Sequence, residues 1–154
     1  MVNERLVWYL EQNGYISPSQ CGFRHMRSCT DVLLRHEAAI CEAFASNQHL
    51  ITVFFNLEKA YDTTWRCGIL KALYSCGLRG EMPLFIKAFL KNRKFKVKVG
   101  TSLSELQVQE EGVPQGCVLS VTLFALAING ISSVIPNEIM HSLFLFLLLQ
   151  VECQ

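Results

Sequence analysis

The stretch that decides the fold is residues 51–65, Ile-Thr-Val-Phe-Phe-Asn-Leu-Glu-Lys-Ala-Tyr-Asp-Thr-Thr-Trp. Its first six residues are mostly β-branched or aromatic and are bounded by polar residues, which predicts a buried strand over 51–56. Asn56 lies where the apolar run breaks, and charged residues follow before a helix that begins near Trp65. A hydrophobic strand that delivers a polar residue at its carboxyl end is a common way to build a site. An edge strand that runs into a polar turn is the other interpretation.

Length and composition restrict the class of protein. A chain of 154 residues forms one domain or a piece of a larger one, and 51% apolar residues supply a substantial core. Seven cysteines without a C-x-x-C pair or a zinc spacing predict free, buried thiols in an intracellular protein. The N-terminus has no apolar signal core. The longest apolar run, 143–149, falls far short of the roughly 20 residues that span a membrane, so we expect no membrane partner.

The periodicity of the apolar residues predicts an α+β fold, with a small antiparallel sheet backed by helices. We expect Phe54 and Leu123 to be buried. The expected helices are 2–12, 31–46, 66–76, 83–92 and 118–128, and the expected strands are 51–56, 93–99, 105–111 and a last one within 138–150. The apolar residues expected to pack the second of these helices into the core are Leu33, Leu34, Ile40, Ala43 and Phe44.

Positive charge is concentrated late in the chain, where six of the fourteen basic residues lie between 87 and 98. Strict alternation over 93–99 predicts a strand with apolar side chains (Phe95, Val97, Val99) inward and lysines outward. Such a lysine row either follows a phosphate backbone or protects an edge strand from aggregation. Two earlier arginines, before a helix that Ser28 or Thr30 caps, either hold phosphates or pack a surface turn. The candidate nucleic-acid-binding residues are therefore Arg24, Arg27, Lys91, Arg93, Lys94, Lys96 and Lys98.

A glycine- and proline-containing loop precedes the last helix. Residues 112–116 read Gly-Val-Pro-Gln-Gly, a pattern that excludes regular structure and lets another backbone or a ligand approach closely. The helix at 118–128 is almost wholly apolar and must be buried.

Four stretches in this order resemble the reverse-transcriptase domain of non-long-terminal-repeat retrotransposons: residues 20–24 (Gln-Cys-Gly-Phe-Arg), 54–62 with Trp65, 89–93 (Phe-Leu-Lys-Asn-Arg), and 112–120 followed by Leu123 and Phe124. Each stretch alone is a weak signal, but together they are specific and cover nearly the whole chain. The resemblance implies a partial right-hand polymerase, with fingers-side helices in 1–50 and the palm in 51–154. It also implies phosphoryl transfer to a DNA primer on an RNA template, with two Mg²⁺ ions held by carboxylates.

The chain departs from this family at the metal ligands. Asn56 stands in the place of the first catalytic aspartate, and Phe146 and Leu147 stand in the places of an aspartate pair. Asp62 matches a second acidic position of the first motif, which is not a metal ligand in the family. The resemblance therefore implies that Mg²⁺ is not bound here and that this chain does not polymerise.

Other residues match the family. Tyr61, five residues past Asn56, occupies the place of an aromatic gate against the ribose 2′-hydroxyl, although ordinary core packing also accounts for it. Gln115 and Gly116 match the motif that contacts the incoming nucleotide and the template. We therefore interpret the chain as a truncated, decayed reverse-transcriptase segment of a transposon. The alternatives are a fragment that binds nucleic acid weakly and without sequence preference, and a functionless relic.

Overall fold

The computed structural model describes residues 1–53 and 57–134. Two compact units are found in it: a first unit of Met1–Val7 with Lys59–Ala127, and a second unit of Trp8–Glu58 with the described residues after Ala127. Helices and two small antiparallel sheets are consistent with the predicted α+β class. The elements are α1 Val2–Gln12, α2 Cys29–Ala45, α3 Arg66–Ser75, α4 Glu81–Leu90, β1 Arg93–Phe95, β2 Lys98–Val99, β3 Ser102–Leu103, β4 Gln107–Gln109, α5 Val118–Ile128 and α6 Ile131–Val134.

Local signals explain where the first two helices begin and end. Helix α1 stops at Gly14, whose φ of 65° is a left-handed conformation that glycine adopts without cost. The buried residues Leu6 and Leu10 lie four positions apart and so share one face of α1. Helix α2 begins with a capping box, in which the Ser28 side chain accepts from the Asp31 backbone N–H and the Asp31 carboxylate accepts from the Ser28 backbone N–H.

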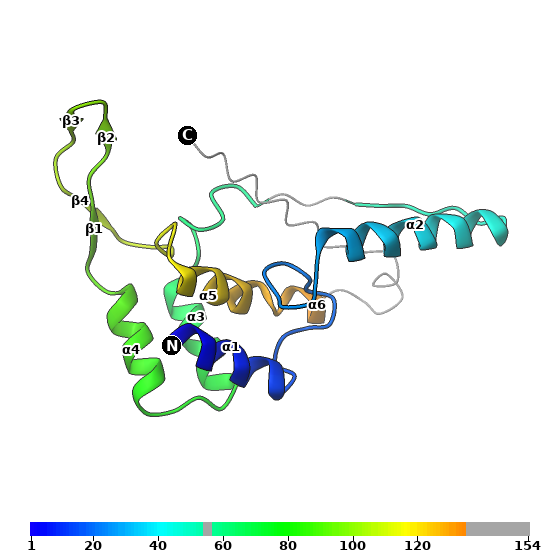
Figure 1. Ribbon diagram of the computed structural model, residues 1–154, viewed down its shortest axis with the longest axis horizontal. Helices are drawn as coiled ribbons and strands as arrows, with labels where there is room; N and C mark the ends of the chain where they lie inside the picture. The colour runs from blue at the N-terminus through cyan, green and yellow to red at the C-terminus, as the bar shows by residue number, and fades with distance from the viewer. Residues whose placement is uncertain (54–56, 135–154) are drawn as a thin grey trace. The chain divides into compact units, whose positions relative to one another are not determined.

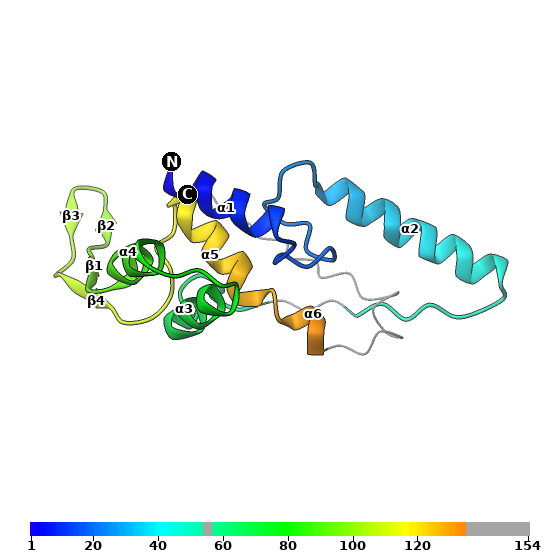
Figure 2. The same ribbon diagram turned by 90° about the horizontal axis from the view of Figure 1, so that it is seen from below.

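The core of the first unit is helical. Helices α3 and α4 pack against each other (Figures 1 and 2), and the fully buried side chains Ile69, Leu73 and Ile86 come from these two helices. Helix α5 is buried along most of its length, as its apolar sequence predicts, and Leu123 is fully buried. The predicted burial of Leu123 is thus confirmed, whereas Phe54 lies outside the described residues.

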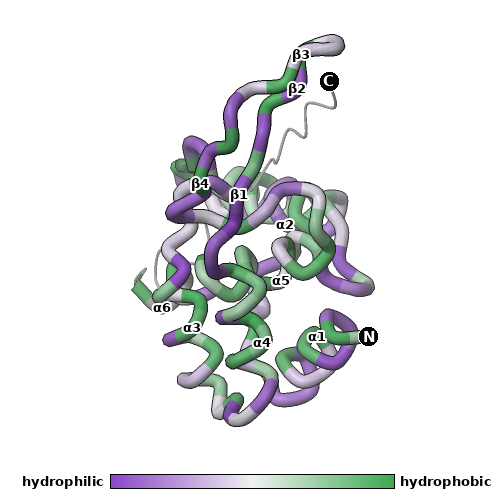
Figure 3. The backbone as a smooth tube through the Cα atoms, turned by 90° about the vertical axis from the view of Figure 1, so that its left-hand side faces the viewer, coloured by the Kyte–Doolittle hydropathy of each residue, from purple (hydrophilic) through white to green (hydrophobic). Residues whose placement is uncertain are grey.

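Residues 93–109 form a β-ribbon that projects from the helices of the first unit (Figures 1 and 3). Strand β1 pairs with β4, and β2 pairs with β3 around a turn at Gly100. The predicted strand is therefore present in two pieces, but its predicted inward face is wrong. Phe95, Val97 and Val99 are 47%, 51% and 74% exposed, because the ribbon has only two strands and no other described element covers these side chains.

Two other expectations of burial are also wrong. Residues 51–53 form no strand and belong to neither described sheet, and Ile51 is 79% exposed. Residues 54–56 of this predicted strand, and the strand predicted within 138–150, lie outside the described residues. Helix α2 forms as predicted but has no buried residue, and its predicted core residues Leu33, Leu34 and Phe44 are exposed. An apolar side chain is buried only where a second element covers it, and the sequence pattern does not say whether that element is present.

The thiols follow the prediction in part. None of the six cysteines in the described ranges forms a disulfide, but only Cys21 and Cys76 are buried. Cys29, Cys41 and Cys67 are exposed, so their predicted burial is wrong. No helix within 1–53 and 57–134 has the length and apolar character needed to cross a membrane.

Candidate functional site

The glycine-containing loop at 112–116 is joined to the turn at 61–64 by two backbone hydrogen bonds. The Gly112 N–H donates to the Thr64 carbonyl at 3.0 Å, and the Val113 N–H donates to the Tyr61 carbonyl at 2.8 Å. Gly112, Val113 and Thr64 are all buried, so these bonds are shielded from water. The two segments, about fifty positions apart in sequence, therefore form one piece of structure.

Gly112 permits this close approach. Its φ is +80°, and a Cβ added there would lie 2.4 Å from the Asp62 carbonyl oxygen and 2.5 Å from that of Tyr61. Any side chain would push the backbones apart as well as strain the left-handed conformation. The sequence prediction that this loop lets another backbone approach closely is confirmed at Gly112.

Arg66, the first residue of α3, also holds this loop. Its Nε donates to the Gly112 carbonyl at 2.8 Å and its Nη2 donates to the Glu111 carbonyl at 3.0 Å. Burial lowers the pKa of Arg66, and the nearby charge of Glu111 opposes this change. Sequence reasoning missed Arg66, because no local pattern indicates a partner 45 or 46 residues away.

Tyr61 is half-buried and packs on the last helix of the first unit. Its ring stacks on Phe124 of α5, with centroids 5.0 Å apart and an interplanar angle of 24°. Burial raises the pKa of the Tyr61 hydroxyl, so this group is protonated at neutral pH and keeps its hydrogen-bond donor. Core packing thus accounts for one face of the ring, while the side chain remains partly accessible.

Gln115 lies beside the same turn. Its Nε2 donates to the Asp62 carboxylate, at 3.3 Å from Oδ1 and 3.5 Å from Oδ2. Both residues are exposed. Gly116, next in the chain, also has a left-handed φ of +78°, but a Cβ there would have no neighbour within 4 Å. The structure therefore brings three of the predicted site residues, Tyr61, Gln115 and Gly116, onto one loop-and-turn unit.

Other predicted site residues lie elsewhere. Asn56, Phe146 and Leu147 fall outside the described residues. Arg24, in the second unit, makes a two-bond contact with Glu11 at 2.6 and 2.8 Å and also donates to backbone carbonyls of its own turn. The Arg24 guanidinium lowers the pKa of the Glu11 carboxyl. These contacts favour the turn-packing interpretation of Arg24 over phosphate binding.

The basic residues of the β-ribbon are mostly open to solvent. Lys91, Lys94, Lys96 and Lys98 are exposed, and the ion pairs of the described residues, Met1–Glu4 and Glu11–Arg24, include none of them. Arg93 is half-buried, with its guanidinium 5.3 Å from the centre of the Phe89 ring. Within the described ranges, no three His, Cys, Asp or Glu side chains gather in a way that could hold a metal ion.

A family model, reverse transcriptase (RNA-dependent DNA polymerase), matches residues 1–147. The chain belongs to the reverse transcriptase family. The resemblance inferred from the four sequence stretches is therefore confirmed.

The chain is also similar to transposon proteins of Drosophila melanogaster. It is 29% identical over 129 residues to a "Probable RNA-directed DNA polymerase from transposon BS", to the "RNA-directed DNA polymerase from mobile element jockey" and to a "Probable RNA-directed DNA polymerase from transposon X-element". Each match covers 82% of this chain but only 14% of the relative, so the chain spans about a seventh of the length of these relatives. No solved structure matches the chain significantly.

Proposed function

We propose that this chain is the nucleotide-contacting segment of a transposon RNA-directed DNA polymerase. In this proposal it is a partial right-hand polymerase, with fingers-side helices in 1–50 and the palm in 51–154. The observation that supports it most is the hydrogen bond from the Val113 N–H to the Tyr61 carbonyl. This bond keeps the aromatic ring and the Gln115–Gly116 loop together, which is what two contacts to one nucleotide require.

Each residue of this unit has a chemical role in the proposal. Tyr61 presents a rigid ring, fixed by Phe124, that blocks an extra hydroxyl on the sugar of the incoming nucleotide. Gln115 offers amide groups for hydrogen bonds, and Asp62 restrains its Nε2. Gly116 leaves open space above its backbone, which admits a ligand to close range.

The residues in the family's metal positions do not fit a pair of Mg²⁺ ions. Mg²⁺ prefers carboxylate oxygens, whereas Asn56 offers a neutral amide and Phe146 and Leu147 offer no donor atom. Asp62, a carboxylate of the loop-and-turn unit, is engaged with Gln115, and no three His, Cys, Asp or Glu side chains gather within residues 1–53 and 57–134 in a way that could hold a metal ion. We therefore propose that the chain does not extend a primer as it stands.

Primer extension on an RNA template, with Mg²⁺ or Mn²⁺, tests this proposal. Three chains are compared: the natural one, Asn56→Asp, and the triple variant Asn56→Asp, Phe146→Asp, Leu147→Asp. We expect no extension by the first two, because the second source of carboxylates is still absent. The triple variant is expected to gain metal affinity, measured by calorimetry, with little extension. Extension by the natural chain would overturn the proposal of a decayed enzyme.

A second candidate function is weak binding of RNA or DNA without sequence preference. The observation that favours it is the projecting β-ribbon, whose lysines are exposed and lack ion-pair partners among the described residues. If about three to five phosphates are contacted, the affinity should fall steeply with salt. Replacing Lys94, Lys96 and Lys98 by glutamate should remove most of the binding. No binding by the natural chain would instead favour a relic without function.

A further inference from the structure

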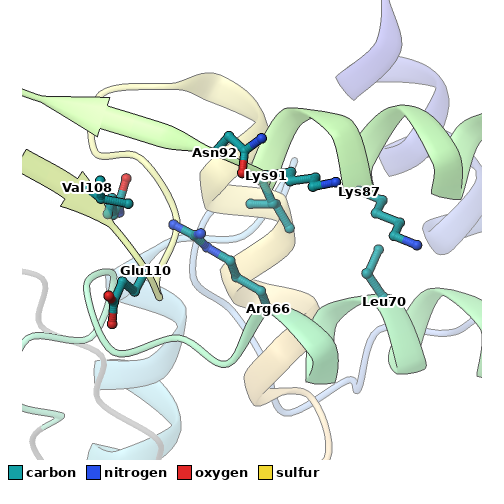
Figure 4. Close-up of a pocket in the computed structure, with 9 residues that line it drawn as sticks. Arg66, Leu70, Lys87, Lys91, Asn92, Val108 and Glu110 are labelled. Atoms are coloured by element: carbon teal, nitrogen blue, oxygen red, sulfur yellow. The ribbon is translucent and has the colours of Figure 1, made fainter.

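A pocket of about 470 Å³ lies where α3, α4 and the β-ribbon meet (Figure 4). Its walls include the apolar side chains of Leu70 and Leu90. Three cationic side chains line it, Arg66, Lys87 and Lys91, against one carboxylate, Glu110. All of these residues belong to the first unit. The pocket lining therefore carries an excess of positive charge.

Arg66 is held in place before any ligand arrives. Its Nε and Nη2 are fixed by the carbonyls of Gly112 and Glu111, while its Nη1 has no hydrogen-bond partner among the described residues. Burial and the charge of Arg93 both lower the pKa of Arg66, and Glu111 compensates only in part. A guanidinium in such surroundings gains from a bound anion, and its fixed geometry reduces the entropy lost on binding.

The lysines at the pocket add mobile donors. Lys87 and Lys91 are exposed, lie four positions apart at the end of α4, and so project from one face of the chain there. Neither is ion-paired to a described carboxylate. Figure 4 shows both side chains on the α4 side of the pocket and the Arg66 side chain reaching toward the β-ribbon. The donors thus come from two helices and line one cavity.

We propose that this pocket binds a phosphodiester group of a single-stranded nucleic acid, an inference that rests on the proposed nucleic-acid binding. Three cations stand against Glu110 in the pocket lining and Glu111 beside Arg66, which leaves a net charge of about +1. This balance suits a single negative charge better than the several charges of a triphosphate. The chain leaves α4 directly into the β-ribbon, where Lys94 and Lys96 continue the unpaired positive charge. Such continuity fits a polymer with repeated charges better than an isolated carboxylate of a peptide.

The test uses a fluorescently labelled oligouridylate and the whole chain, with affinity measured by anisotropy over a range of salt concentrations. The double variant Lys87→Gln, Lys91→Gln should lose about one phosphate contact. This loss makes the slope of log affinity against log salt shallower by about 0.7 and lowers the affinity about fivefold at about 0.1 M salt. Both side chains are exposed, so the fold is expected to survive, which circular dichroism checks.

Lys71→Gln is the matched control for each single variant. Lys71 is also an exposed lysine of the first unit, on α3, but it does not line the pocket. Lys87→Gln and Lys91→Gln should each weaken binding more than this control, although the charge change is identical.

The outcomes separate the two proposals. If the natural chain binds no oligouridylate, both the nucleic-acid binding and the pocket assignment fail. If it binds, and the pocket variants behave like Lys71→Gln, only the pocket assignment is overturned. Polyglutamate is the competing probe. If polyglutamate binding depends on Lys87 and Lys91 and oligouridylate binding does not, the pocket binds an acidic peptide instead, and the proposal is overturned.

Discussion

Replacing Gly112 by alanine is the most direct perturbation of the site. The added Cβ would lie 2.4 Å from the Asp62 carbonyl oxygen and 2.5 Å from that of Tyr61, both main-chain atoms that no side-chain rotation can move away. The loop must therefore separate from the 61–64 turn. Separation breaks the hydrogen bonds that Gly112 and Val113 donate to this turn.

The size of the effect follows from these contacts. An alanine at a φ of +80° costs about 1–2 kcal/mol relative to glycine. Each of the two broken backbone hydrogen bonds adds about 0.5–1.5 kcal/mol. The expected loss in the free energy of unfolding is therefore about 2–5 kcal/mol, a large share of the stability of an ordinary domain.

Gly116→Ala is the matched control. Gly116 has nearly the same φ, +78°, in the same loop, but a Cβ there meets nothing within 4 Å. Gly116→Ala should lower the free energy of unfolding only by the cost of placing alanine in the left-handed conformation, about 1–2 kcal/mol. The entropy that alanine removes from the unfolded chain is the same in both variants, so it cancels in the comparison.

Urea unfolding followed by circular dichroism measures the difference. With a slope of about 1–3 kcal/mol per molar urea for a chain of this size, the midpoints of the two variants should differ by about 1 M. Equal midpoints for Gly112→Ala and Gly116→Ala would refute the reasoning, because the approach of the two backbones would then contribute nothing to stability.

Three further predictions concern other contacts. Arg66→Lys should lower the free energy of unfolding by about 1–2 kcal/mol in the same urea assay, because an ammonium lacks the fork of donors that reaches both the Glu111 and Gly112 carbonyls. An unchanged urea midpoint would contradict this. Arg24 holds the pKa of Glu11 below its usual 4.5, so the stabilisation from this carboxylate is complete above pH 4.5 and disappears as the pH falls through the lowered pKa. Glu11→Gln should therefore make the free energy of unfolding depend less on pH in the acid range. An unchanged pH dependence would argue against the ion pair. A chain ending near Pro136 should be more soluble than the whole chain, because residues 143–149 are apolar, uncharged and free of proline, as aggregation-prone segments are. Equal solubility of the two chains in a sedimentation assay would count against this.

Local signals in the sequence were sufficient for most of the helices. The predicted bounds of 2–12 and 118–128 agree with α1 and α5. A helix stop at Gly14 and an apolar run after a loop are both signals that a few neighbouring residues contain. The Gly-x-Pro-x-Gly pattern also predicted the close approach of another backbone. It did not predict which backbone, and the partner at 61–64 emerged only from the fold.

Burial could not be predicted in the same way. The alternation at 93–99 and the apolar residues of α2 are both typical of elements with one buried face, yet these side chains are largely exposed. Whether an apolar face is covered depends on residues far along the chain. The local sequence pattern contains no information about those distant residues.

Arg66 shows the same limit within the site. A single arginine after Trp65 has no distinguishing neighbour in the sequence, whereas in the structure it joins the start of α3 to the loop before α5. Only the three-dimensional arrangement reveals that the same guanidinium also faces a cationic pocket.

Among the described residues, the interactions that support the loop-and-turn unit come from its own backbone, from α5 and from Arg66. Tyr61 is held by a backbone bond and by stacking on Phe124, and the loop is held by Arg66. Carboxylates gathered around a metal repel one another when the metal is absent, so their replacement removes strain rather than support. A sequence that has Asn56, Phe146 and Leu147 in those places can therefore retain the geometry around Tyr61 and Gln115. Under the proposed function, the loop-and-turn unit of such a chain keeps its geometry without metal-dependent chemistry, so the proposed nucleotide contact and the proposed lack of polymerase activity are compatible.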